Sequence, residues 1–339
     1  MSEIRWDALT GRPVIVAEAR AARPNEHAGA PLTAGPPGEC PFCEGREDRT
    51  PPEVAAIRPT GSPANGAGWS VRAFANRFPS LAPEDPAVEP GPVVGLRRRS
   101  GHGVHEVVVE SPTHAPLLFE LPDAQVRRAL AVVRDRVRAA TERPGVAAGL
   151  AFENCGPESG GTLWHPHAQV AGTPTIPPRL AEELARGPPV GGDEPGCLLE
   201  RTVAEERAAA DRIVHEDGTF TLFAPFGSEH PFALRAVPRR HGPSVGLASD
   251  DEVAALGSLL PRFLRALQAL APGASYNWSI ASLPPGLASD AYHWHLELSP
   301  RLVKADGFEL ASGIPVIPVA PETAAQRYRA VWESVASPG

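Results

Sequence analysis

The chain has 339 residues, a formal net charge of -8, 42% apolar residues and 21% charged residues. This composition favours a globular protein with a buried core, and the length suits two units of about 150 residues. The acidic balance argues against nucleic acid as the main ligand, because binding to a phosphate backbone needs an excess of Lys and Arg. There is no run of 18 apolar residues, so we expect no membrane span. The polar start of the chain predicts a cytoplasmic protein without a signal peptide.

Hydrophobic periodicity predicts the elements of the first half in chain order. We expect strands at 13–17, 70–74, 105–110, 149–154 and 165–170, a surface loop at 82–103 and a helix at 123–143. The apolar residues of this helix recur every three or four positions from Val126 to Val137. Pro122 and Pro144 mark its limits.

The second half predicts the same kinds of element in the same order. We expect strands at 219–223, 232–237, 276–280 and 294–298. A helix should begin at Ser249, because Ser249 and Glu252 have the spacing of a capping box.

Histidines recur at almost constant spacing in the two halves. His114 precedes His165 by 51 residues, and His241 precedes His293 by 52. The His-x-His motifs that begin at His165 and His293 are 128 residues apart. We therefore predict an α+β fold of two tandem units, each an antiparallel sheet with flanking helices. The predicted units are residues 1–178 and 179–339.

Four cysteines are too few for a disulfide framework in a chain of this kind, and two of them stand close together. Cys40 and Cys43 have a spacing that can chelate one Zn²⁺, which takes four N or S ligands in a tetrahedron. The alternative is a buried or redox-active pair. If the repeat is real, His114 and His165 are the natural remaining ligands.

The sharpest motif is His165-Pro-His167-Ala-Gln169. In a strand, residues i, i+2 and i+4 share one face, and Pro166 predicts an edge strand or a local irregularity. The motif follows a Gly-rich turn at 154–162, which suits the close approach of a phosphate. A neutral imidazole can attack phosphorus, whereas a Gln can hold phosphate oxygens but cannot titrate. The alternative is a polar strand face without chemistry.

Several stretches together resemble the galactose-1-phosphate uridylyltransferase family of the histidine-triad superfamily, and especially its ADP-glucose phosphorylase branch. They include Cys40-Pro-Phe-Cys43-Glu-Gly-Arg-Glu47, His105-Glu-Val-Val-Val-Glu-Ser-Pro-Thr-His114, the His165 motif, Pro238-Arg-Arg-His241, Tyr292-His-Trp-His295 and Gly307-Phe-Glu309. The resemblance implies a two-step nucleotidyltransferase.

The resemblance also implies roles for particular residues. His167 would be the nucleophile and Gln169 would contact the phosphates. The implied ligands of a structural zinc are Cys40, Cys43, His114 and His165. The implied substrate contacts are Arg20, Arg23, Asn76 and Asn154 for the nucleotide, Thr162 for the phosphate, and Phe308 and Glu309 for the hexose.

The second half departs from the family pattern. The phosphorylase branch holds a second zinc with a second Cys-x-x-Cys, whereas this chain has a Glu at the second of these positions. The candidate set is Cys197, Glu200, His241 and His293. A helix that begins at Leu198 would explain Glu200 equally well. Because Glu297 stands in place of Gln after His295 and no Gly-rich turn precedes it, we expect a degenerate copy that supplies substrate contacts.

The expected reaction is transfer of a nucleoside monophosphate, with UMP as the expected group, from an NDP-hexose to a hexose-1-phosphate through a nucleotidyl-histidine. One alternative is an NDP-sugar phosphorylase that uses inorganic phosphate. An alternative of another class is a non-catalytic, zinc-dependent nucleotide-binding protein. The expected partners are an NDP-sugar and a sugar-1-phosphate or phosphate, and the chain could form a homodimer. The base, the sugar and the oligomeric state stay open.

Overall fold

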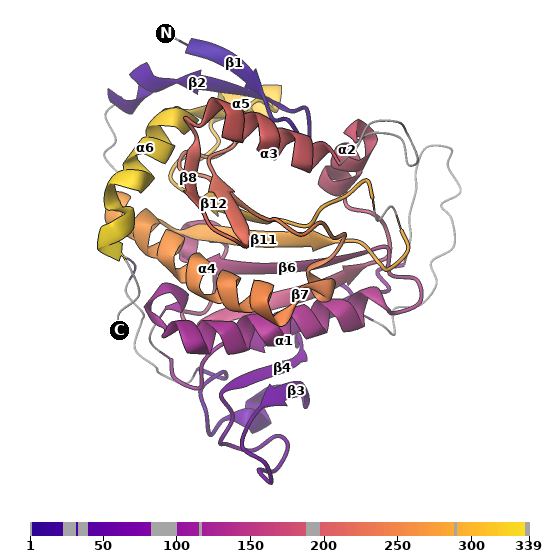
Figure 1. Ribbon diagram of the computed structural model, residues 1–339. Helices are drawn as coiled ribbons and strands as arrows, with labels where there is room; N and C mark the ends of the chain where they lie inside the picture. Colours follow the sequence, from indigo (N-terminus) through magenta and orange to yellow (C-terminus); the bar gives the residue numbers. More distant parts are fainter. Residues whose placement is uncertain are drawn as a thin grey trace.

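The computed structural model describes residues 2–22, 32, 40–82, 100–114, 117–187, 197–287 and 290–335, so most of the loop predicted at 82–103 lies outside the described residues. Its central feature is an antiparallel sheet of ten strands (Figure 1). The strands are β3 (Glu53–Ile57), β4 (Val71–Ala75), β5 (Val104–Val109), β6 (Ala148–Cys155), β7 (His167–Thr173), β8 (Ile213–Glu216), β9 (Phe220–Phe223), β10 (Leu234–Pro238), β11 (Tyr276–Ser282) and β12 (Leu296–Pro300).

The strand order shows the internal repeat. The sheet runs β3-β4-β5-β7-β6-β11-β12-β10-β9-β8, so five strands of the first half are mirrored by five of the second. The halves join where β6 and β11 pair antiparallel, with Cys155 opposite Tyr276 and Gly149 opposite Ser282. The predicted α+β class with antiparallel strands and flanking helices is confirmed. The two units share one continuous sheet, and the division between residues 178 and 179 remains a prediction.

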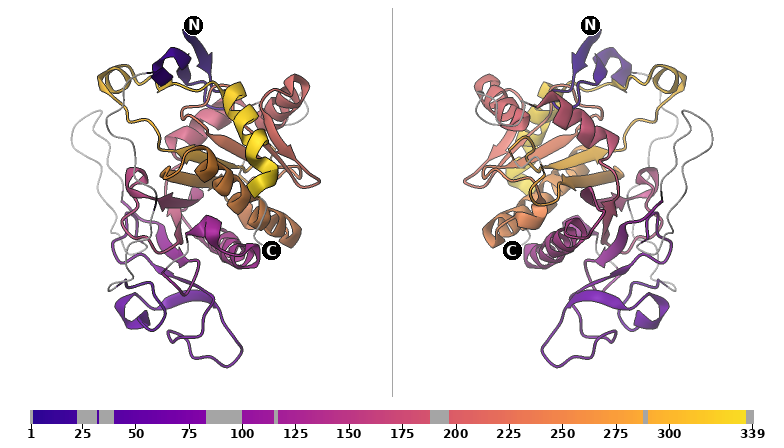
Figure 2. Two further views of the ribbon diagram at one scale, coloured as in Figure 1. Left: turned by 90° about the vertical axis from the view of Figure 1, so that its left-hand side faces the viewer. Right: turned by 90° about the vertical axis from the view of Figure 1, so that its right-hand side faces the viewer.

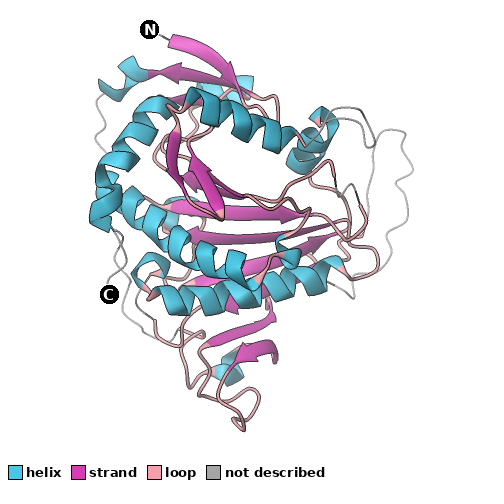
Figure 3. Ribbon diagram, viewed as in Figure 1, coloured by secondary structure: helices cyan, strands magenta, loops and turns pink. Residues whose placement is uncertain are grey.

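Two long helices cover one face of this sheet (Figures 1 and 3). α1 (Asp123–Thr141) and α4 (Asp250–Leu270) lie against each other and contribute their apolar faces to the main core. The predicted capping box is present, since the Ser249 side chain accepts a hydrogen bond from the Glu252 N–H and Glu252 accepts one from the Ser249 N–H. After a quarter turn the two helices lie together on one side of the sheet (Figure 2).

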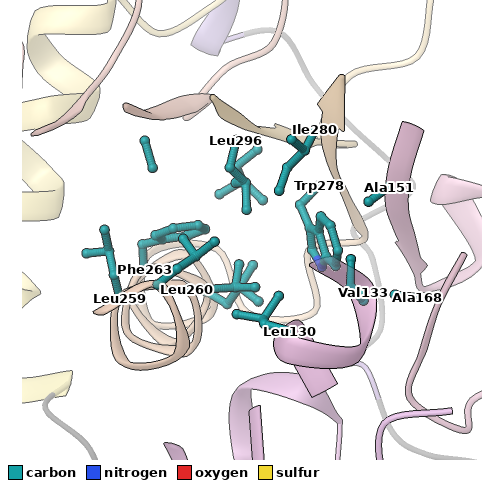
Figure 4. Close-up of a cluster of buried hydrophobic side chains, with 14 of the residues drawn as sticks. Leu130, Val133, Ala151, Ala168, Leu259, Leu260, Phe263, Trp278, Ile280 and Leu296 are labelled. Carbon is teal, nitrogen blue, oxygen red and sulfur yellow. The ribbon is translucent and has the colours of Figure 1, made fainter. Parts of the chain in front are cut away.

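Figure 4 shows how the core joins the two halves. Leu130 of α1 and Phe263 of α4 point toward Trp278 and Leu296 of the second-half strands. Trp278 is fully buried beside the junction strand β6, so the same side chains stabilise both units.

Smaller elements surround the sheet. A three-stranded sheet is formed by β1 (Ser2–Trp6), β2 (Pro13–Ala17) and β13 (Val316–Ile317), in which β13 pairs in parallel with β2 from the start of the chain. The remaining α-helices are α2 (Pro178–Arg186), α3 (Leu198–Ala209), α5 (Gly307–Ser312) and α6 (Pro321–Trp332).

Three strands begin two residues later than predicted. β7 begins at His167 rather than at residue 165, β10 begins at Leu234 rather than at 232, and β12 begins at Leu296 rather than at 294. The prediction of an edge strand at Pro166 was wrong, because β7 lies between β5 and β6. The irregularity is instead a delayed start, since Pro166 has no N–H to donate to the ladder.

The helix α4 is the one described helix whose length and composition would allow a membrane span. More than half of its apolar window is buried in the protein, and Leu260, Phe263 and Leu267 are fully buried in the core. A helix buried in the core of a protein can have the length and the hydropathy of a membrane span.

The contact between α1 and α4 generates a stability prediction. A Cβ atom on Gly257 would lie 2.3 Å from Cγ and 3.0 Å from Cα of Arg127. We expect Gly257→Val to lower the free energy of unfolding by about 1–3 kcal/mol, because overpacking forces the helices apart. The matched control is Ala269→Val, at an exposed position of the same helix. Equal melting temperatures for the two variants would contradict this reading of the helix contact.

Candidate functional site

The candidate site lies on the sheet face opposite α1. Along a strand, alternate side chains point to opposite faces. Ala168 and Val170 of β7 are buried in the core that α1 covers, so His167 and Gln169 point to the other face. His167 and Gln169 therefore lie side by side on this face, as the alternation of the motif predicts.

Hydrogen bonding fixes the tautomer of His167. Its Nδ1 atom lies 2.7 Å from the carbonyl oxygen of His165, which can only accept, so Nδ1 carries the proton. The neutral ring then has its lone pair on Nε2. The side chain is 9% exposed, and burial lowers the pKa of His167 below its ordinary value. A neutral imidazole with a free Nε2 is the form that can act as a nucleophile.

Cys40, Cys43, His114 and His165 come together beside this histidine. Their ligand atoms all lie within 4.8 Å of one another. His165 Nδ1 is 3.7 Å from both sulfurs, and His114 Nδ1 is 3.8 Å from the Cys43 sulfur. Tetrahedral Zn–S and Zn–N bonds would put sulfur and nitrogen about 3.6 Å apart. The cluster therefore has the donor set and the size of a zinc site.

The surroundings of the cluster agree with metal binding. His165 Nε2 donates to the Ser111 carbonyl oxygen at 2.7 Å, which leaves the Nδ1 lone pair facing the sulfurs. Burial lowers the pKa of His165 to about 4. Burial and the neighbouring Cys40 raise the pKa of the Cys43 thiol. A bound cation would reverse that last effect, because it favours the thiolate.

Phe42 connects the cluster to His167. Its ring meets the His167 ring edge-on, with centroids 5.1 Å apart, and lies 6.1 Å from the His165 ring. Because Phe42 stands between Cys40 and Cys43, a metal that fixed the two cysteines would also fix the wall behind His167.

The second catalytic prediction, Gln169, has a polar partner that the sequence analysis missed. Gln169 Oε1 lies 2.8 Å from Nε2 of His105, on the neighbouring strand β5. Asn76, predicted to contact the nucleotide, has its Nδ2 atom 3.2 Å from the same ring nitrogen. These three side chains form one polar group next to His167.

The Gly-rich turn lies at the junction of the two halves. Asn154 Oδ1 accepts a hydrogen bond of 2.6 Å from Asn277, which also donates to the carbonyl of Ser159. Gly156 has φ of +89°, and a Cβ atom there would lie 2.3 Å from Ser275 Oγ, so the turn needs glycine at this point. Asn277, opposite Asn154 in the sheet, was not predicted because only the pairing of β6 with β11 brings it here.

The other predicted substrate contacts are less tightly grouped. Arg20 lies 3.5 Å from Asp306, immediately before α5, which contains Phe308 and Glu309. Glu309 closes a capping box with Asp306, and Phe308 is half exposed. Thr162 is exposed, and Arg23 lies outside the described residues.

A lysine brings this segment to the turn. Lys304 Nζ is 3.0 Å from a carboxylate oxygen of Glu158 in the Gly-rich turn. A pocket of about 210 Å³ beside it is lined by residues that include Glu229, His230, Lys304 and Glu309. The predicted hexose-contacting segment therefore lies near the Gly-rich turn of the same chain.

The second candidate metal cluster is only partly assembled. Cys197, Glu200 and His241 lie together, whereas His293 is not part of the group. His293 Nδ1 accepts from the Gly242 N–H at 3.3 Å, and its Nε2 donates to the Pro238 carbonyl. Glu200 accepts from the Cys197 N–H at 2.9 Å, as the helix-start alternative expected. The buried His241 Nε2 lacks a hydrogen-bond partner among the described residues, so the three-residue set could still take a metal.

The second half repeats the histidine arrangement, with a carboxylate beside the second histidine. His295 Nδ1 lies 3.1 Å from the His293 carbonyl oxygen, but its Nε2 faces the Glu297 carboxylate at 3.6 Å. Although burial acts in the opposite direction, Arg235 and Arg179 hold the pKa of Glu297 well below its usual range. Ion pairs thus occupy the position that corresponds to Gln169.

Three comparisons place the chain among known proteins. Residues 1–177 match the family described as galactose-1-phosphate uridyl transferase, N-terminal domain. An ADP-glucose phosphorylase of Arabidopsis thaliana is 29% identical over 97% of this chain and 93% of its own length. A galactose-1-phosphate uridylyltransferase of Thermotoga maritima is 26% identical over 97% of this chain and 98% of its own.

Solved structures agree with this placement. The crystal structure of an Arabidopsis thaliana ADP-glucose phosphorylase with bound ADP-glucose superposes with a TM-score of 0.79 at 26% identity. The match covers 97% of this chain and 99% of that one. The resemblance noted in the sequence is confirmed, and the chain belongs to the galactose-1-phosphate uridyl transferase family.

Proposed function

We propose that the protein transfers a nucleoside monophosphate from an NDP-hexose through a covalent adduct on His167. The observation that carries the proposal is the tautomer of His167, whose Nδ1 proton is held by the His165 carbonyl so that Nε2 is free to attack. The polar group of Gln169 and Asn76 and the Gly-rich turn next to it support binding of phosphates at the same place.

In the first half-reaction, Nε2 of His167 attacks the α-phosphorus of the NDP-hexose. A P–N bond forms, the P–O bond to the β-phosphate breaks, and hexose-1-phosphate leaves as an anion with the bonding electrons. The ring becomes a substituted imidazolium that keeps its Nδ1 proton, and the His165 carbonyl oxygen stabilises this positive charge. No general acid is required, which agrees with the non-titrating Gln169.

In the second half-reaction, a phosphate oxygen of the acceptor attacks the same phosphorus and the P–N bond breaks. Neutral His167 is restored with its lone pair on Nε2. We favour a hexose-1-phosphate as acceptor and UMP as the transferred group. The pocket lined in part by Glu229, Lys304 and Glu309 supports this choice, since sugar hydroxyls removed from water need hydrogen-bond partners and these side chains can supply them.

Inorganic phosphate is the second candidate acceptor. The observation in its favour is the similarity to the Arabidopsis thaliana ADP-glucose phosphorylase in both sequence and structure. The first half-reaction is the same in both cases, so the two candidates differ only in what discharges the adduct. A cytoplasmic location and a homodimer remain predictions.

We further propose that Cys40, Cys43, His114 and His165 hold one Zn²⁺ with a structural role. When bound, the metal would supply four protein–metal bonds that fix the Cys40–Cys43 loop. Fixing this loop and His165 would also fix the ring of His167, because Phe42 packs on that ring and the His165 carbonyl holds its Nδ1 proton. For Cys197, Glu200 and His241 we propose a second, weaker site.

The covalent adduct is the first prediction of this proposal. Mixing the protein with UDP-glucose or ADP-glucose should raise its intact mass by one nucleoside monophosphate. His167→Ala should show no adduct, whereas His295→Ala should still form it. Separate addition of a hexose-1-phosphate or phosphate then identifies the acceptor that removes the adduct faster. Normal turnover by His167→Ala would refute the assignment of the nucleophile.

Metal content provides a second prediction. The purified protein should contain at least one equivalent of zinc, and Cys40→Ser should lose that zinc together with several degrees of melting temperature, because a structural zinc contributes directly to folding. Cys155→Ala is the matched control, since Cys155 is also buried but lies outside both clusters. Unchanged zinc content in Cys40→Ser would contradict the proposed ligand set.

The lowered pKa of His167 predicts the pH dependence of adduct formation. An ordinary histidine is half protonated near pH about 6.5, and only the neutral ring can attack. Because burial moves the pKa down, the rate should keep its plateau below about pH 6.5 and fall only as the pH drops through the lower value. Rapid mixing at a series of pH values measures this. A midpoint at or above about pH 6.5 would be inconsistent with a buried, neutral nucleophile.

A further inference from the structure

His105 occupies a position that the proposed reaction does not yet explain. It lies on β5, where Val107 pairs with Gln169 and His105 pairs with Ala171 of β7. The side chains of His105 and Gln169 are therefore diagonal neighbours on the same face of the sheet. His105 is half-buried, and both of its ring nitrogens have a partner.

The backbone decides which nitrogen of His105 carries the proton. The N–H of Ser80 donates to His105 Nδ1 at 3.0 Å, so Nδ1 must offer a lone pair. A backbone N–H cannot reverse its role, and the neutral ring then carries its proton on Nε2. The Nε2–H group donates to Gln169 Oε1 at 2.8 Å.

This bond determines the orientation of the Gln169 amide. The carbonyl oxygen is committed to His105, so the NH₂ group is the part of the amide that remains for a ligand. A flipped amide would place its N–H groups against another N–H donor. The Asn76 amide is fixed in a related way, because its Oδ1 accepts from the Phe78 N–H at 2.9 Å. Its Nδ2 atom lies 3.2 Å from the protonated Nε2 of His105, and because both groups are donors this contact is not a hydrogen bond. Both amides are thus left with N–H donors, which suit the acceptor oxygens of a phosphate.

We propose that His105 is a positioning residue that locks Gln169 with its NH₂ group toward the α-phosphate. The proposal rests on the proposed function, since it concerns how the same site holds its substrate. His105 itself touches no reacting atom in this account. It acts through Gln169, so its effect on adduct formation requires that Gln169 be present.

A double-mutant cycle tests this dependence. The four proteins are the unaltered chain, His105→Phe, Gln169→Ala and the double variant, each mixed rapidly with saturating NDP-sugar. We expect His105→Phe to slow adduct formation by about tenfold, the usual effect of losing one buried hydrogen bond of this kind. In the Gln169→Ala background the same change should cost less than about twofold.

A conservative variant separates positioning from packing. His105→Gln can place an amide N–H near the lost Nε2–H and should recover most of the rate, whereas His105→Phe keeps the ring volume but not the donor. His215→Phe is the control, because His215 lies on the far edge strand β8. Melting temperatures of all variants should stay within a few degrees of one another.

The possible results are distinct. Equal slowing by His105→Phe with and without Gln169 would overturn the positioning role and indicate a general structural effect. The positioning role would also be overturned if His105→Phe formed the adduct at the normal rate while Gln169→Ala formed it slowly. Failure of the unaltered protein to form any adduct would instead contradict the proposed function.

Discussion

The hydrogen bond from His167 Nδ1 to the carbonyl oxygen of His165 is the interaction on which the site depends. His165 serves both sides of it: its ring faces the two cysteine sulfurs, and its own carbonyl holds the nucleophile candidate. Pro166 between them has no N–H to donate to the ladder, and the strand begins at His167. One short segment thereby joins the candidate metal cluster to the group that fixes the tautomer of His167.

The second half of the chain has the same histidine–carbonyl hydrogen bond but a different group beside Nε2. His295 keeps the same bond to the carbonyl two residues before it, yet Glu297 stands against its Nε2. The Glu297 carboxylate is paired with Arg235 and Arg179, which hold its pKa low although burial acts in the opposite direction, whereas Gln169 at the corresponding position is a neutral amide. The repeat therefore preserves the scaffold in both halves, while the residue four positions after the first histidine gives the two copies different chemistry.

Sequence patterns predicted the elements whose cause is local. The periodicity from Val126 to Val137 and the capping box at Ser249 specify α1 and α4, and the histidine spacing revealed the repeat. The continuous sheet and the contacts of His105 and Asn277 were not predictable in this way. They depend on which strands are neighbours and in what register, and no single segment contains that information. His105 carried one signal that could have been used, a titratable side chain in a strand that otherwise consists of valines and Glu106.

The most direct test of the account is the protonation state of the His167 ring in the free protein. Nitrogen-15 NMR of the protein labelled at its histidines, with His167→Gln to assign the signals, distinguishes a protonated ring nitrogen from an unprotonated one. The account predicts, at neutral pH, a neutral ring with its proton on Nδ1 and an unprotonated Nε2. A proton on Nε2, in either the neutral or the charged ring, would contradict it.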